Sequence, residues 1–128
     1  MTFPFTAYVS CKSGNEINVF AGDAETGTLE QIQSISPDHS GPGWIGRGLP
    51  LAHSRDGTRL YASVIGLKDG EEEDRIDTYA IHPETRKLTL MSSTPVMAQL
   101  SHISLDQTGQ FILGASVPSD LVLSLIHI

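Results

Sequence analysis

Two side chains of this sequence are of types that bind anions, and each lies beside a segment with a strand-like pattern. His102 begins the stretch 102–105, which continues with alternating apolar and polar residues. Its imidazole, neutral or protonated, could bind a phosphate or polarise a carbonyl group. The competing interpretation is a structural histidine that forms a hydrogen bond to a neighbouring unit of the fold. We keep His102 as a candidate ligand-binding residue.

Arg47 is the second candidate. It lies in the segment 41–48, where four of eight residues are glycine and one is Trp44, which predicts a constrained loop. An arginine in such a loop could hold a carboxylate or phosphate through two parallel hydrogen bonds. No Gly-Lys-Ser/Thr follows, so the segment is not a phosphate-binding P-loop. An ordinary surface loop is the competing interpretation.

The other polar residues that stand out favour structural roles. We expect His53, in the middle of a predicted strand, to pack or to bond the backbone. The acidic run 71–74 suggests calcium, but calcium sites draw on several segments, and a run of carboxylates at a hairpin tip is usually a solvated loop. Cys11 is the only cysteine, which excludes an internal disulfide and disfavours a zinc site. We predict no metal and no cofactor.

The composition is that of a globular protein, with 39% apolar and 18% charged residues among 128. The net charge of -7 argues against a nucleic-acid partner, because such a partner requires a basic face. It does not exclude a small anion in a local basic pocket. No apolar run approaches about 18 residues, so we expect no membrane span. The first ten residues lack the pattern of a secretory signal, so we expect a cytoplasmic protein.

An internal repeat identifies the strands and turns that would position these side chains. The segment 51–63 aligns with 103–115, and Gly57 and Gly109 correspond at an offset of 52 residues. A second unit aligns 17–29 with 76–88 at an offset of 59. The strand 7–9 aligns with 60–62 at an offset of 53, and the insertion 68–74 accounts for the difference. Repeats of this length are typical of solenoids and propellers.

The repeated units have the pattern of strands and turns. Apolar and polar residues alternate in 17–20 and 76–79, and Asp56-Gly57 and Thr108-Gly109 supply the positive-φ residue of a tight turn. Four short strands in about 50 residues are typical of a β-propeller blade. The predicted strands are 7–11, 16–21 and 28–34, the outer three of a first blade (7–34); 51–54, 59–65, 75–81 and 87–92, a whole second blade (50–92); and 102–105 and 110–116, the start of a third (101–122).

We therefore predict an all-β protein, a partial propeller domain (1–122) of about two and a third four-stranded antiparallel blades. Propellers contain about four to eight blades, and a third blade that stops after two strands leaves an unpaired edge. The sequence thus suggests a truncated chain, in which a later segment would supply the inner strand of the first blade. Residues 123–128 resemble a translated sequencing-adapter tail, and we predict that they are non-native. A genuine third strand is the alternative, because the tail is apolar.

Three segments resemble the lactonase-type seven-bladed β-propellers, the 6-phosphogluconolactonase-like family: the start at 7–10, the second-blade opening at 50–62 and the third-blade opening at 101–116. The resemblance extends from about residue 6 to 122. Arg55 stands where proline is common and Val117 where tyrosine is common, which blurs the subfamily.

The resemblance implies a lactone hydrolase that converts 6-phospho-glucono-1,5-lactone to 6-phosphogluconate in the pentose phosphate pathway. Its partner would be a small phosphorylated sugar lactone, and the full-length protein would be a monomer. The family's catalytic groups lie mostly in later blades, so none is assigned here, and we expect the piece itself to be inactive and poorly stable. The alternatives are a carboxymuconate-type lactonising enzyme and a non-enzymatic binding propeller; the latter is disfavoured because Trp-Asp and Gly-His signatures are absent.

Overall fold

The computed structural model describes residues 4–11, 16–37 and 44–126, and for residues 44–49, 68 and 126 it describes the backbone alone. All regular structure in these ranges is β-strand, as predicted. The strands are β1 (Pro4–Cys11), β2 (Glu16–Asp23), β3 (Leu29–Ile35), β4 (Trp44–His53), β5 (Arg59–Lys68), β6 (Glu71–Glu72), β7 (Arg75–Ile81), β8 (Leu88–Pro95), β9 (His102–Leu105), β10 (Phe111–Ser116) and β11 (Leu121–Ile126).

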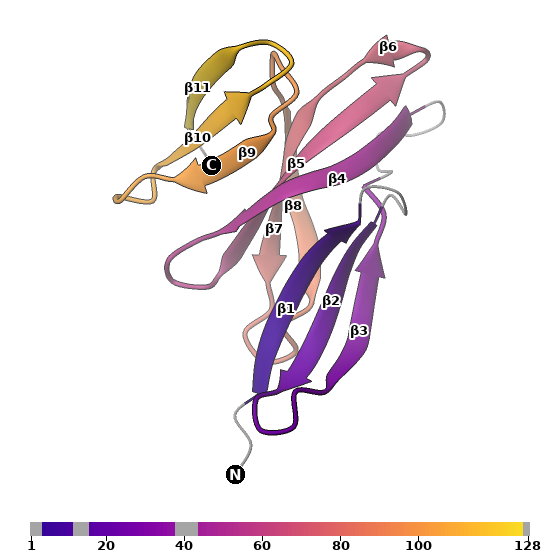
Figure 1. Ribbon diagram of the computed structural model, residues 1–128, viewed down its shortest axis with the longest axis vertical. Helices are drawn as coiled ribbons and strands as arrows, with labels where there is room; N and C mark the ends of the chain where they lie inside the picture. The colour runs from indigo at the N-terminus through magenta and orange to yellow at the C-terminus, as the bar shows by residue number, and fades with distance from the viewer. Residues whose placement is uncertain (1–3, 12–15, 38–43, 127–128) are drawn as a thin grey trace.

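The strands form three antiparallel sheets, which Figure 1 shows as separate units along the chain. We call them blade 1 (β1-β2-β3), blade 2 (β4-β5-β7-β8, with the short β6 beside β5) and blade 3 (β9-β10-β11). Each blade is a continuous run of the sequence, and strands that follow one another pair through short turns. Among the described residues there is no helix with the length and apolar character needed to cross a lipid bilayer.

Most strand ends shift by a few residues from the sequence prediction, and two segments differ more. β4 begins at Trp44 rather than at residue 51, so residues 44–48, predicted as loop, form strand. The cause is β5, which reaches Lys68 and gives this segment a partner along its length. The pairing is irregular between Gly48 and Leu51, where Pro50 has no N–H to donate. In blade 3, the residues 121–126 form a third strand on β10; whether the tail is native stays a prediction.

The two predicted turns repeat in atomic detail. Gly57 and Gly109 both have a φ of 73°, the conformation that favours glycine. In the second turn the Asp106 carboxylate accepts hydrogen bonds from the backbone N–H groups of Thr108, Gln110 and Phe111. These bonds tie the start of β10 to the end of β9, so the sequence signal for a hairpin is confirmed.

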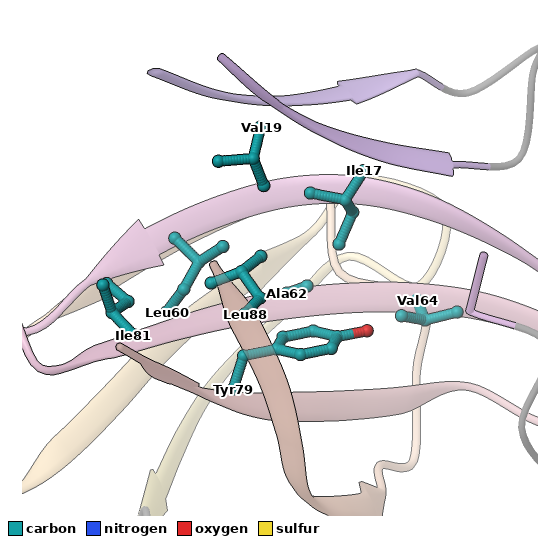
Figure 2. Packing of buried hydrophobic residues seen from close by; sticks show 8 residues of the cluster. All are labelled: Ile17, Val19, Leu60, Ala62, Val64, Tyr79, Ile81 and Leu88. Carbon is teal, nitrogen blue, oxygen red and sulfur yellow. The ribbon is translucent and has the colours of Figure 1, made fainter. Parts of the chain in front are cut away.

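The hydrophobic core consists of two clusters, one at each junction between blades. The first joins Ile17 and Val19 of blade 1 to residues of blade 2, among them Leu60, Ala62 and Tyr79. Figure 2 shows Ile17 and Val19 reaching from one sheet toward this group on the next. The second cluster joins blade 2 to blade 3; its buried members are Tyr61, Ile76, Leu100, Ile103 and Ile112. Because neighbouring residues of β5 point to opposite faces, blade 2 contributes to both clusters.

Candidate functional site

The innermost strands of blades 2 and 3, β4 and β9, lie beside each other and carry both predicted ligand-binding residues. The sequence offset of 52 is also the structural offset, because Leu51 pairs with Ala62 and Ile103 pairs with Gly114. His102 therefore corresponds to Pro50, and Arg47 lies three residues earlier, roughly 10 Å along the strand. Both residues belong to the same end of the inner strands.

The structure places these two candidates differently. The His102 side chain is exposed and lies on the face of β9 that it shares with Ala115, opposite to the buried Ile103. Arg47 is part of β4, where its backbone lies opposite Ile65, and its side chain falls outside the described residues. Residues 41–43 of the glycine-rich segment also fall outside them. Ligand binding by both side chains therefore stays a prediction.

His53 lies at the other end of β4, beside a cleft of about 400 Å³ between blades 1 and 2. Its Nδ1 is 2.9 Å from the backbone oxygen of Ser54. Since a carbonyl oxygen only accepts, Nδ1 carries the proton, and the predicted backbone bond is confirmed. In the same cleft, the Tyr8 hydroxyl donates to the backbone oxygen of Arg86 over 2.8 Å. Burial raises the pKa of Tyr8, against the opposing charge of Arg86, so this phenol stays protonated.

A second cleft, of about 330 Å³, opens between the β4–β5 turn and the β9–β10 turn. Two cationic side chains line it, Arg55 and Arg59, together with Asp56. Hydrogen bonds from Ser54 and Thr58 lower the pKa of Asp56 to about 2, so its carboxylate is ionised at neutral pH and offsets part of the positive charge. Sequence reasoning missed this pair of arginines. Their spacing across a predicted turn was the available signal.

The family comparison decides the identity of the fold. The family described as "Lactonase, 7-bladed beta-propeller" matches residues 5–127. The chain belongs to this lactonase family. The predicted fold class, a fragment of a β-propeller, is therefore confirmed, and the three sheets are consecutive blades. No curated protein matches the chain.

Solved structures resemble this lactonase-family chain over nearly its whole length. A crystal structure described as a candidate 6-phosphogluconolactonase from Bacteroides uniformis ATCC 8492 is 27% identical, with a TM-score of 0.78; the match covers 96% of this chain and 33% of that one. The periplasmic gluconolactonase PpgL of Pseudomonas aeruginosa is 22% identical, with a TM-score of 0.80 and coverage of 96% and 32%. This second likeness shows the fold alone. The chain spans about a third of the length of these structures.

The lactonase-family chain also has an acidic hollow of about 510 Å³ at the β5–β6–β7 hairpin. The described residues that line it are all acidic: Asp69, Glu71, Glu72 and Glu73. Next to them Asp74 is buried, and burial together with the neighbouring Glu72 raises the pKa of Asp74 to about 6. Among the described residues, no group of three or more His, Cys, Asp or Glu side chains is arranged to hold a metal ion.

Proposed function

We propose that the chain is the first part of a lactone hydrolase, and specifically of a 6-phosphogluconolactonase that converts 6-phospho-D-glucono-1,5-lactone to 6-phosphogluconate. The observation that carries the proposal is the family match over residues 5–127. The likeness to the Bacteroides uniformis structure supports the choice of substrate class. Within this proposal the protein acts in the cytoplasm, where phosphorylated sugars are formed and retained, and the complete propeller is a monomer.

The reaction sets clear requirements for the site. Water adds to the C1 carbonyl, the bond from C1 to the ring oxygen breaks, and that oxygen takes up a proton. A general base must accept the proton of the water, donors must stabilise the developing oxyanion, and a cation must hold the phosphate. From this chain, Arg47 is suited to the phosphate, because a guanidinium binds it through two parallel hydrogen bonds.

His102 is suited to a substrate oxygen. It lies at the start of the inner strand β9, and β9 neighbours the strand that carries Arg47. An imidazole there can donate to the lactone carbonyl or to a sugar hydroxyl. The groups that activate water would come from blades beyond the 128 residues, so the proposal assigns binding, and no catalytic step, to this chain.

The test uses the complete parent protein and 6-phosphogluconolactone, with hydrolysis followed against the spontaneous rate. We expect catalysed turnover, and we expect Arg47→Ala to raise KM by about 10-fold to 100-fold, the value of one or two hydrogen bonds to a charged group. His102→Ala should weaken binding as well, whereas His53→Ala, at the opposite end of β4, is the matched control. Hydrolysis at the spontaneous rate would refute the proposal, and turnover of carboxymuconate instead would favour the lactonising enzyme.

A further inference from the structure

The cleft between the β4–β5 turn and the β9–β10 turn gathers positive charge in an acidic chain. Two of the eight Lys and Arg residues of the sequence line it, Arg55 in the turn and Arg59 at the start of β5. Among the described residues of its lining, Asp56 is the one acidic side chain, so the two guanidinium groups leave one positive charge in excess. We call this feature the Arg55–Arg59 cleft.

Both guanidinium groups keep hydrogen-bond donors for a ligand. Nη1 of Arg59 lies 2.9 Å from Sδ of Met91, and a thioether is a weak and uncharged acceptor. Arg75 shows the contrast, because it forms an ion pair of 3.1 Å with Glu73. Within the described ranges, neither Arg55 nor Arg59 forms an ion pair with a carboxylate. An anion in the cleft would therefore meet charges that the fold has only partly offset.

The carboxylates beside the cleft are engaged within their own turns. Oδ1 of Asp56 accepts hydrogen bonds from the Ser54 hydroxyl and from the backbone N–H and the hydroxyl of Thr58. In the facing turn, both oxygens of Asp106 accept bonds from the N–H groups that follow it. These bonds hold the acidic groups to the turn backbone, so the arginines are the residues of this cleft that are suited to a ligand.

The cleft has a counterpart at the junction between blades 1 and 2. Three positions are shared by the two linings at the repeat offsets of 53 and 52: Tyr8 with Tyr61, Thr6 with Arg59, and Gly57 with Gly109. The β7–β8 turn also borders the first cleft, through Arg86, so the hollow persists beside the outer strands of the following blade. The meeting of two blades therefore supplies the hollow. The residue types at 55 and 59 supply the charge, because the counterpart of Arg59 is an uncharged threonine.

The dimensions of the Arg55–Arg59 cleft limit the class of ligand. Its volume of about 330 Å³ is at the lower end of small-molecule sites, which span roughly 300–1,000 Å³. On the side of the β9–β10 turn, no atom lies within 4 Å of the position that a Cβ of Gly109 would occupy, so a ligand can approach the backbone there. Two guanidinium groups from different elements can each bind oxygens of one phosphate, whereas a carboxylate is matched by one guanidinium.

We propose that the Arg55–Arg59 cleft binds the phosphate group of a small phosphorylated metabolite. The cleft lies beyond the end of β4 that carries His53, whereas Arg47 lies near its start. Because a strand rises about 3.3 Å per residue, Arg47 and His53 are roughly 20 Å apart. A ligand in the cleft therefore does not overlap a substrate held at Arg47, and the inference does not depend on the proposed function.

The experiment measures the binding of inorganic phosphate and of glucose 6-phosphate to the complete parent protein by isothermal titration calorimetry at fixed ionic strength. An Arg47→Ala background removes any phosphate bound at the other end of the inner strands. We expect Arg55→Gln and Arg59→Gln each to weaken binding by about 10-fold, the value of a hydrogen bond to a charged group. Lys87→Gln is the matched control, because it removes one charge from an exposed side chain outside the described linings of both clefts.

Two further measurements separate a phosphate site from a general effect of charge. Asp56→Asn should strengthen binding by about 2-fold to 5-fold, because it removes the opposing charge while the amide oxygen can still accept the bonds from Thr58. Gluconate, which offers a carboxylate in place of the phosphate, should bind at least about 10-fold more weakly than glucose 6-phosphate. Circular dichroism checks that each variant is folded. Should Arg59→Gln unfold, Thr108→Glu replaces it, because this change sets a carboxylate on the facing wall.

Four results would overturn the proposal. The first is a phosphate affinity that neither Arg55→Gln nor Arg59→Gln changes, or no binding in the Arg47→Ala background. The second is an equal loss in Lys87→Gln, which would indicate a general effect of net charge. The third is a loss in Arg86→Gln alone, which would place the ligand in the counterpart cleft. The fourth is gluconate that binds as tightly as glucose 6-phosphate.

Discussion

Replacing Ile112 by alanine tests which face of β10 holds blade 3 to blade 2. Ile112 is 2% exposed and belongs to the cluster that joins the two blades. The change removes three carbon groups, which are worth about 0.8 kcal/mol each when buried, so the transfer term is about 2.4 kcal/mol. The cavity that remains adds to this, and we expect a total loss of about 3–4 kcal/mol in the free energy of unfolding.

Leu113→Ala is the matched control for this change. It removes the same number of carbon groups one residue further along the strand, from a side chain that is 39% exposed, so the expected loss is at most about 1.5 kcal/mol. Urea denaturation at a fixed low protein concentration measures both values, because association would otherwise contribute to stability. If the whole chain is less stable than the predicted loss, Ile112→Ala will be unfolded without urea while Leu113→Ala stays folded. Equal losses, or a larger loss for Leu113→Ala, would refute the register of blade 3.

Three further predictions concern the pH dependence of stability and the turns. Burial raises the pKa of Asp74 to about 6, so the folded chain keeps the proton of this carboxyl to higher pH than the unfolded chain does. The urea midpoint should therefore fall as the pH rises from about 4 to about 6 and stay level at higher pH, and the Asp74→Asn variant should lack this slope. Hydrogen bonds, above all the one from Thr108, lower the pKa of Asp106, so the ionised carboxylate stabilises the fold at pH 7. Asp106→Ala should therefore lower the urea midpoint at pH 7, and this difference from the unaltered chain should disappear as the pH falls through the lowered pKa; equal differences at pH 7 and pH 2 would contradict the prediction. Gly109 has a φ of 73° with open space around it, so Gly109→Ala should cost about 1–2 kcal/mol by backbone strain alone, with Gly109→Asn costing less; a neutral alanine variant would count against strain.

The repeat in the sequence predicts more of the backbone than the residue types do. Glycines at 57 and 109 indicate their own positive φ, and both adopt it. Arg86 gives no such signal by its type, yet its φ is 65°, close to the 72° of Gly27, its counterpart at an offset of 59. The turn after β7 therefore keeps the geometry of the turn after β2, although the residue that favours this geometry is present in one copy only.

The start of β4 and the two clefts show what the sequence could not supply. Four glycines in 41–48 predict a loop, because glycine disfavours strands, but pairing with the long β5 overrides this local preference. The clefts lie between turns of different blades, so their lining depends on how the blades pack. Spacing along the chain predicts which residues are near in one blade. It does not predict the hydrogen bond between Tyr8 of blade 1 and Arg86 of blade 2.

A polar network in blade 2 explains why a buried carboxylate there is structural. Asp77 of β7 is fully buried, and its Oδ1 accepts a hydrogen bond of 2.6 Å from Ser93, which lies opposite to it on β8. Arg75 donates in turn to Ser93, through both the hydroxyl and the backbone oxygen. Each polar group of this trio therefore has a partner, and together they join the two outer strands.

The corresponding three positions of blade 1 are also polar, but the acidic residue stands at a different one of them. Glu16, Asn18 and Ser34 correspond to the trio of blade 2 at the offset of 59. There Glu16 is the acceptor, receiving bonds from Asn18 Nδ2 and from the Ser34 hydroxyl. A side-chain hydrogen bond between the outer strands is present in both blades, although the acidic and basic residues stand at different positions. These positions therefore serve to join the outer strands and do not require a particular catalytic group. The predicted ligand-binding residues belong to other strands, because Arg47 is part of β4 and His102 is part of β9.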